Sequence, residues 1–167
     1  MVTIEPNEIL AAVYFIVPAY MANAMPIVFG GGPPIDLGRT LSDGERLFGA
    51  NKTVKGFVSG LLFGFGVGLV PSVFLKSYSV ATGFLIALGS LCGDLCGAFV
   101  KRRLRLKPGF PLPLLDQLDF IFGALLFSYP ALGFDIDVVF LILLVTPPMH
   151  LATNVVAYLL KIKENYW

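Results

Sequence analysis

Acidic and basic side chains gather at the ends of long apolar stretches in this sequence. Asp94 lies inside one such stretch and is followed by the basic run 101–103, while Asp116 and Asp119 open the next stretch. Residues three apart on a helix share one face, with β-carbons about 5–6 Å apart, so these two acids are spaced to share a divalent cation. Hard carboxylate oxygens suit magnesium, whose coordination is completed by waters and phosphates. The pattern indicates metal and phosphate chemistry at the edge of a membrane.

Each of these acids also has a purely structural interpretation. A carboxylate such as Asp94 near the bilayer centre costs about 2.5–3.5 kcal/mol on insertion scales, and a basic neighbour alone would neutralise it. Asp116 and Asp119 at the start of a helix would also complement its dipole. The combination favours a metal site, because three acids and the cations of the connecting loop must lie close in space.

A second basic segment, NKTVKG at residues 51–56, stands directly before another apolar stretch. Lysine and threonine at a helix start, together with the free amides of its first turn, are typical of an anion site. The G-x-x-x-x-G-K-[ST] spacing of a P-loop is absent. Membrane-flanking lysines are the alternative interpretation of Lys52 and Lys55.

His150 and Asn154 stand four residues apart near the middle of the last apolar stretch. A lone histidine there is more often a helix-to-helix hydrogen-bonding residue than a ligand, so the role of this pair stays open. Cys92 and Cys96 are interpreted as small apolar residues, because the chain has no further cysteine to complete a metal site.

The composition is that of an integral membrane protein. The 167 residues are 56% hydrophobic and 14% charged, and the mean hydropathy is +0.81, which is too apolar for an ordinary soluble domain. A net charge of +1 gives no basic face for nucleic acid, so we expect no nucleic-acid partner. Crossing a bilayer takes about 20 apolar residues. The sequence predicts an all-α single membrane domain over 1–167 with about five transmembrane helices, at about 8–29, 56–75, 79–100, 117–134 and 138–160.

The distribution of positive charge predicts the orientation. Of the 12 lysines and arginines, all but Lys76 fall in the loops at about 30–55 and 101–116 or at the C-terminus. By the positive-inside rule these segments are cytoplasmic and the N-terminus is outside. We therefore expect a multi-pass protein of the cell membrane with its active site on the cytoplasmic face.

Three glycines in the second stretch, Gly60, Gly64 and Gly68, repeat every four residues. This small-xxx-small spacing lets helix backbones approach closely. Packing within the chain and a dimer interface both satisfy it, so the oligomeric state stays open.

In chain order, the motifs NKT-x-x-G, GDL followed by KRR, PLLDQLD and PPMHLATN resemble the archaeal CDP-archaeol synthases, which are similar to the bacterial CDP-diacylglycerol synthases. The resemblance covers essentially the whole chain. It implies transfer of a cytidylyl group from CTP to an unsaturated archaeal ether lipid phosphate, 2,3-bis-O-geranylgeranylglyceryl phosphate. The products would be a CDP-archaeol-type lipid and pyrophosphate, with Mg²⁺ as cofactor and with CTP, the lipid phosphate and membrane lipids as partners.

The resemblance also implies roles for single residues. Catalytic roles fall on Asp94, Lys101, Arg102, Asp116 and Asp119. The metal would be held by Asp116, Asp119 and Asp94. Substrate binding falls on Asn51, Lys52, Thr53, Lys55 and Arg103. The sequence departs from the related patterns at Ala98, where serine is common, and at Gln117, where the bacterial enzymes have arginine, and it lacks their His-Gly-Gly.

Two other classes of protein are weighed. A small polytopic transporter or channel subunit would use Asp94 and the proline- and glycine-broken helices as its pathway. Polar groups should then reach across the bilayer, whereas here they cluster on one face. Asp43-Gly44 is similar to the start of the CDP-alcohol phosphotransferase motif, but the further aspartates of that motif do not follow.

Overall fold

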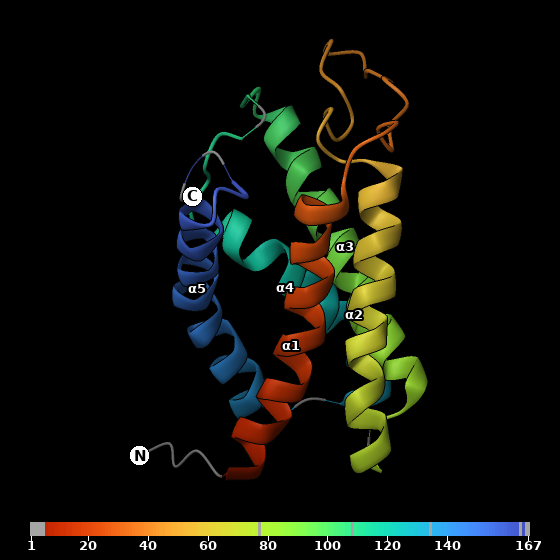
Figure 1. Cartoon of the computed structure of the whole chain (residues 1–167), viewed down its shortest axis with the longest axis vertical. Helices are drawn as coiled ribbons and strands as arrows, with labels where there is room; N and C mark the ends of the chain where they lie inside the picture. Colours follow the sequence, from red (N-terminus) through yellow and green to blue (C-terminus); the bar gives the residue numbers. More distant parts are fainter. Residues whose placement is uncertain (1–5, 77, 108, 134, 164, 166–167) are drawn as a thin grey trace.

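The residues that the structure describes form five α-helices. The computed structural model describes residues 6–76, 78–107, 109–133, 135–163 and 165. The helices are α1 (Pro6–Phe29), α2 (Val54–Phe74), α3 (Val80–Arg103), α4 (Leu115–Leu132) and α5 (Ile136–Leu159) (Figure 1). Within these described ranges the chain forms two isolated β-bridges and no strand. The predicted all-α class with five helices is confirmed; residues 1–5 and 166–167 of the expected domain lie outside the described residues.

Four of the helices are long and apolar enough to cross a membrane, namely α1, α2, α3 and α5. The fifth, α4, has 18 residues, or about 27 Å at 1.5 Å per residue. Its first turns carry Asp116, Gln117 and Asp119, which lower its hydropathy. All three polar residues are partly buried, and α4 packs against α1, α3 and α5.

The polar loops gather at one end of the bundle. In Figure 1 the segments between α1 and α2 and between α3 and α4 lie at the upper end, where α5 also ends. Thr53 begins α2, and its side chain accepts a hydrogen bond from the Gly56 amide at 3.1 Å. Lys101, Arg102 and Arg103 form the last turn of α3, where positive charge complements the helix dipole. The basic motifs of the sequence therefore meet at the same end.

The repeated glycines of α2 pack inside the chain. A β-carbon built at Gly64 would lie 2.6 Å from Ala22 Cβ and 3.0 Å from Ala87 Cβ. At Gly68 it would lie 2.8 Å from the α-carbon of Gly83. The small-xxx-small spacing thus brings α1 and α3 against α2. Of the two interpretations, packing within the chain and a dimer interface, these contacts correspond to the first.

Glycines also join α3 to α4, the most closely packed pair of helices among the described residues. Gly89, Gly93 and Gly97 repeat every four residues on α3. A β-carbon at Gly89 would overlap the Gly123 carbonyl, and one at Gly97 would overlap the Asp119 carboxylate. The missing side chains therefore let the polar first turns of α4 lie directly against α3.

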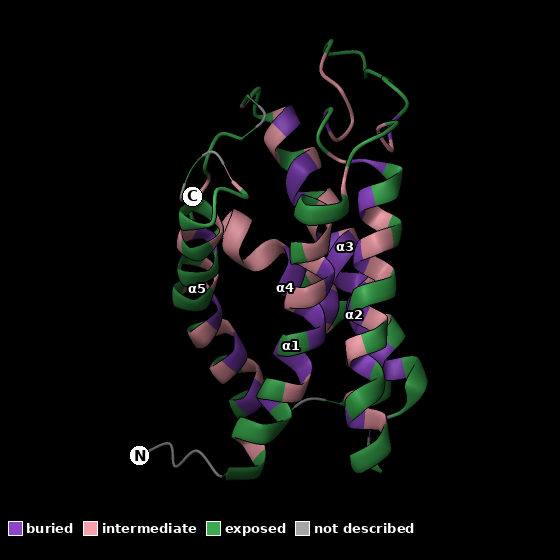
Figure 2. Ribbon diagram, viewed as in Figure 1, coloured by how far each residue is buried: buried purple, intermediate pink, exposed green. Residues whose placement is uncertain are grey.

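Helix α5 is held less extensively. In the part of the chain that the structure describes, it packs against α1 and α4, and its backbone does not come close to that of α2 or α3. The fully buried side chains Phe15, Ile86, Phe120 and Ile142 belong to one core cluster. Figure 2 shows the buried segments of the helices in purple. Outward-facing apolar residues on the helices remain exposed, as expected for surfaces that contact lipid.

Replacing Gly64 by leucine should lower the melting temperature of the protein in detergent. The new side chain would collide with Ala22 and Ala87, and overpacking costs about 1–3 kcal/mol. Gly66→Leu is the matched control, because no atom lies within 4 Å of a β-carbon at Gly66. Equal melting temperatures of the two variants would contradict the packing described for α2.

Candidate active site

A cavity of about 1290 Å³ opens among α1, α3, α4, α5 and the loop that precedes α2. Most of the side chains singled out in the sequence line it, namely Asn51, Lys52, Thr53, Asp94, Lys101, Arg102, Asp116 and Asp119. Lys55 and Arg103 do not line it. Residues from three separate segments, the loop before α2, α3 and α4, are thus brought to one site.

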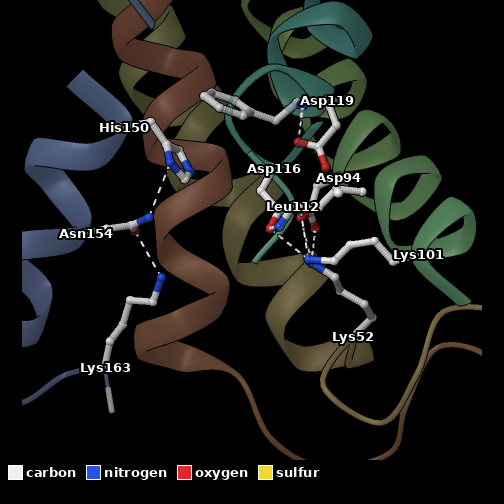
Figure 3. A network of polar contacts seen from close by, with 10 residues as sticks. Lys52, Asp94, Lys101, Leu112, Asp116, Asp119, His150, Asn154 and Lys163 are labelled. Atoms are coloured by element: carbon white, nitrogen blue, oxygen red, sulfur yellow. Dashed lines mark hydrogen bonds and ion pairs between the residues drawn. The ribbon is translucent and has the colours of Figure 1, made fainter. Parts of the chain in front are cut away.

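Two ion pairs dominate the polar part of the cavity. Lys52 Nζ lies 2.6 Å from each carboxylate oxygen of Asp94. Lys101 Nζ lies 2.8 Å and 2.7 Å from the two oxygens of Asp116. Figure 3 shows both lysines converging on these acids. Each pair joins different segments, so the loop before α2 is fastened to α3, and the end of α3 to the start of α4.

Charge balance decides the protonation of Lys52, which lies outside the helices. Burial would lower the pKa of its ammonium group, but the adjacent Asp94 carboxylate outweighs this effect and raises the pKa, with smaller contributions from Asp119 and Asp116. Lys52 is therefore a protonated side chain that stays positively charged beside Asp94.

Asp119 is held by packing. Its Oδ1 accepts a hydrogen bond from the Phe120 amide at 2.6 Å, and its Oδ2 occupies the space that a side chain at position 97 would fill. The ion pairs of the described residues involve Asp94 and Asp116 but not Asp119. Its carboxylate is thus positioned by a glycine and lacks a paired lysine.

The acids suit magnesium in chemistry but do not form a closed metal cage. Among the described residues, no three Asp, Glu, His or Cys side chains are arranged to hold a metal ion. Magnesium does not need three, since it is usually bound by one or two carboxylates together with water and substrate phosphates. The donor set, and the recess beside Gly97 that admits Asp119, fit such an ion.

Arg102 is a buried cation that faces the cavity. Only 6% of its surface is exposed, and its Nε has no hydrogen-bond partner in the described part of the chain. The side chain lies against Gly49: a β-carbon built at Gly49 would be 3.7 Å from Arg102 Cδ and 3.8 Å from Arg102 Nη1. An uncompensated buried charge is costly, so this position is suited to an anion that enters the cavity.

Arg103 fastens the first loop to the end of α3. Its Nη1 donates to Asp43 Oδ2 at 2.6 Å, and its Nη2 donates to the carbonyl oxygens of Glu45 and Arg46 at 3.2 and 2.5 Å. The guanidinium also lies 5.1 Å from the centre of the Phe99 ring. These contacts direct Arg103 away from the cavity lining; its role in substrate binding stays a prediction.

A buried carboxylate organises the same loop. Asp36 has a fully buried side chain and forms an ion pair with Arg46. Its oxygens also accept backbone hydrogen bonds, which come from Gly38, Phe48 and Gly49. Burial alone would raise the pKa of Asp36, but Arg46 and these amides outweigh it and hold the pKa well below its ordinary value. No motif in the sequence points to Asp36, because its partners lie 2–13 positions away in an irregular loop.

A third polar group approaches from α5 and the segment after it. Lys163 Nζ donates to Asn154 Oδ1 at 3.0 Å, and Asn154 Nδ2 lies 3.2 Å from His150 Nδ1. The His150 ring is 5.9 Å from that of Phe120. The sequence left His150 and Asn154 open and assigned Lys163 only to the basic cytoplasmic face; no spacing rule links a lysine beyond a helix end to that helix.

The remaining predicted residues lie at the edge of the site. Asn51 is exposed at the cavity rim. The Thr53 hydroxyl caps α2 and also accepts from the Gly31 amide at 3.2 Å. Lys55 is exposed on the outer side of α2. The lysine of the NKTVKG segment that reaches the acids is therefore Lys52.

A helical membrane bundle with carboxylates, paired lysines and a buried arginine around an internal cavity defines an intramembrane enzyme that acts on phosphorylated substrates. The chain belongs to the CDP-archaeol synthase family: the model of that family, described as CarS-like, matches residues 6–167. Members of this family are CTP-dependent nucleotidyltransferases of archaeal lipid biosynthesis. The predicted family and enzyme class are confirmed, and the transporter alternative is set aside.

Individual relatives agree with this assignment. The CDP-archaeol synthase of Pyrococcus furiosus is 47% identical over 166 residues, which cover 96% of this chain and 99% of the relative. That of Methanococcoides burtonii is 44% identical, with 90% of this chain and 99% of the relative covered. A solved structure described as an intramembrane enzyme for archaeal membrane lipids biosynthesis is 42% identical. Its TM-score to this structure is 0.80, and the match covers 87% of this chain and 94% of the chain of the solved structure.

Replacing Gly97 by alanine should reduce turnover by about a hundredfold, because the new methyl group would displace the Asp119 carboxylate by the order of 1 Å. Gly66→Ala, on the open face of α2, serves as the control. Steady-state rates and melting temperatures of both variants should be measured. Normal turnover by a folded Gly97→Ala protein would contradict a role for the position of Asp119.

Asp36→Asn should destabilise the first loop at neutral pH by about 1–3 kcal/mol, the cost of unmatched buried hydrogen-bonding groups. A carboxyl group whose pKa is lowered by folding stabilises the protein above its unfolded pKa of about 3.9. That contribution is lost as the pH falls towards the folded pKa. The stability difference between wild type and variant should therefore narrow below about pH 4, as measured by melting in detergent. A difference that is constant with pH would show that the charge of Asp36 is not involved.

Proposed function

We propose that this enzyme transfers the cytidylyl group of CTP to the phosphate of 2,3-bis-O-geranylgeranylglyceryl phosphate, releasing pyrophosphate. The observation that carries the proposal is the convergence of Asp94, Asp116 and Asp119 with Lys52, Lys101 and Arg102 in one cavity that many apolar side chains also line. Such a cavity suits a nucleotide triphosphate and a lipid phosphate together. The whole chain would act as one membrane domain.

An oxygen of the lipid phosphate attacks the α-phosphorus of CTP. The bond that forms joins this oxygen to the α-phosphorus, and the bond that breaks joins the α-phosphorus to the oxygen bridging it to the β-phosphate. The electron pair leaves with pyrophosphate. Because the attacking phosphate is already ionised at neutral pH, no side chain is required as a general base, and catalysis rests on positioning and electrostatics.

The side chains of the chain have separate tasks in this reaction. Arg102 binds an anionic phosphate, since it is buried beside the cavity with no described partner at Nε. Lys52 and Lys101 hold the carboxylates of Asp94 and Asp116 in place and provide charge-assisted donors for incoming phosphates.

Magnesium is the proposed cofactor. Asp116, Asp119 and Asp94 would hold it. When bound, it would neutralise the triphosphate and the departing pyrophosphate. Asn51 at the rim of the cavity and the first turn of α2 behind Thr53 are proposed to contact the nucleotide, as are the more distant Lys55 and Arg103.

We further propose that the loop end of the bundle faces the cytoplasm of the cell. All lysines and arginines except Lys76 lie in segments at that end or beyond the end of α5. The N-terminus would then be outside and the C-terminus inside. CTP would enter from the cytoplasm, and the lipid would enter between helices.

The reaction is tested with purified protein, labelled CTP, the lipid phosphate and magnesium. We expect pyrophosphate release that depends on all three. Asp116→Asn and Asp119→Asn should lower turnover by more than about a hundredfold, because each removes a charge that acts on the reacting phosphates. Asp137→Asn changes an exposed acid at the start of α5 and should leave turnover unchanged. Absence of pyrophosphate release with every lipid phosphate would reject the proposed reaction.

Arg102→Ala should raise the KM for CTP by about ten- to a hundredfold, the value of one charge-assisted hydrogen bond. Arg105→Ala is the matched control, because Arg105 is exposed just beyond the end of α3. An unchanged KM for CTP in a folded Arg102→Ala protein would remove Arg102 from the nucleotide site.

A further inference from the structure

Lys52 is carried by a tight turn, residues 49–52, that precedes α2. Its amide donates to the Gly49 carbonyl oxygen at 3.4 Å and closes the turn. Its Nζ lies 2.6 Å from each carboxylate oxygen of Asp94 (Figure 3). A lysine side chain is a flexible aliphatic stem, so its ammonium keeps one position only where the backbone that carries it is held. The position of Lys52 in the site therefore depends on what holds the 49–52 turn.

Adjacent residues of the first loop hold both ends of this turn. The Asp36 carboxylate accepts a hydrogen bond from the Gly49 amide at 3.1 Å. The Ile35 amide donates to the Lys52 carbonyl oxygen at 2.8 Å. The side chain of Asp36 is fully buried and is itself held by an ion pair with Arg46. Because hydrogen bonds to a charged acceptor are the stronger class, the Asp36 carboxylate is the firmer of the two attachments.

Gly49 is the point at which the turn meets α3. Its φ angle is +101°, in a region that residues with a side chain rarely adopt. A β-carbon built at Gly49 would lie 3.7 Å from Cδ of Arg102, so the backbone of the turn lies beside the last turn of α3. Asp36 thus holds the turn against the helix that also carries Asp94.

We propose that Asp36 is a positioning residue for the reaction, which acts through Gly49 and the 49–52 turn to hold the Lys52 ammonium on Asp94. This inference rests on the proposed function, in which Lys52 fixes the Asp94 carboxylate and donates to the incoming phosphates. Asp36 is not among the residues that line the cavity, so it acts through Lys52 and not by contact with a substrate. Loss of its charge weakens the bond to Gly49 and lets the turn, and Lys52 with it, move.

The position of Lys52 is tested first without turnover. Full-length wild-type protein and Asp36→Asn, in detergent without nucleotide or divalent metal, are acetylated with the N-hydroxysuccinimide ester of acetic acid. The rates at Lys52 and Lys55 are followed by mass spectrometry. The contact with Asp94 protects Lys52, whereas Lys55 is exposed and reports general reactivity. We expect acetylation of Lys52 to be about tenfold faster in Asp36→Asn, the effect of weakening one charge-assisted hydrogen bond, with Lys55 unchanged. Equal rates at Lys52 would overturn the inference.

Matched variants of the same loop separate positioning from a general loosening. Asp43→Asn removes a charge that has no bond to the 49–52 turn. Gly49→Ala strains the turn itself and decides the matter should Asp36→Asn fold poorly. Its control is Gly44→Ala, since Gly44 has a similar φ of +81° and no atom within 4 Å of a built β-carbon. Gly49→Ala should speed the acetylation of Lys52, and both control variants should match wild type. Equally fast acetylation in either control would contradict the proposed role.

A double-mutant cycle connects the position of Lys52 with the reaction. Asp36→Asn should lower kcat/KM for CTP by about ten- to a hundredfold. In a Lys52→Met background the same change should lower it by less than about threefold, because residues that act through one another are not additive. A merely structural role of Asp36 would leave the two losses additive, and that result would overturn the inference. The acetylation result does not depend on pyrophosphate release, so failure of the proposed function is distinguished from failure of this inference.

Discussion

The arrangement of this protein depends on the need to neutralise carboxylates that lie on helices of a membrane bundle. Asp94 and Asp116 would be costly beside hydrocarbon, and each is held by a lysine from another segment at 2.6–2.8 Å. The same contacts fix the geometry: Lys52 draws the first loop down onto α3, and Lys101 joins the end of α3 to the start of α4. The same two ion pairs therefore neutralise the acids and hold the segments of the site together.

Close helix packing makes these contacts possible. The glycines of α3 leave room for the polar first turns of α4 and for the Asp119 carboxylate. The glycines of α2 allow α1 and α3 to pack closely against α2. In contrast, among the described residues α5 packs against α1 and α4 and does not approach the backbones of α2 and α3 closely. The closely packed part of the bundle thus carries the acids, and the less extensively packed α5 borders the cavity of about 1290 Å³.

Further polar contacts hold the loop between α1 and α2 in place. Asp36 gathers Arg46 and three backbone amides around a fully buried carboxylate, and Arg103 binds the loop to α3. An irregular loop with these interactions can present Lys52 at a defined position. For the proposed reaction, whose nucleophile is an ionised phosphate, such positioning is the main contribution that a protein can make.

Composition and apolar run lengths by themselves determined the all-α membrane class and the five helices, because a bilayer admits few other solutions. The motifs determined the family and singled out most of the charged residues that line the cavity. Only the tertiary structure decided which charges meet. The sequence placed Asp116 and Asp119 on one face as a pair, whereas in the folded chain Asp116 binds Lys101 and Asp119 packs against Gly97. The tertiary structure also gives the similar residues Lys52 and Lys55 different environments, since Lys52 reaches the acids and Lys55 does not. It likewise brings Lys163 to Asn154. Such contacts join residues 9–42 positions apart in the chain, and they follow from helix packing, which local spacing does not encode.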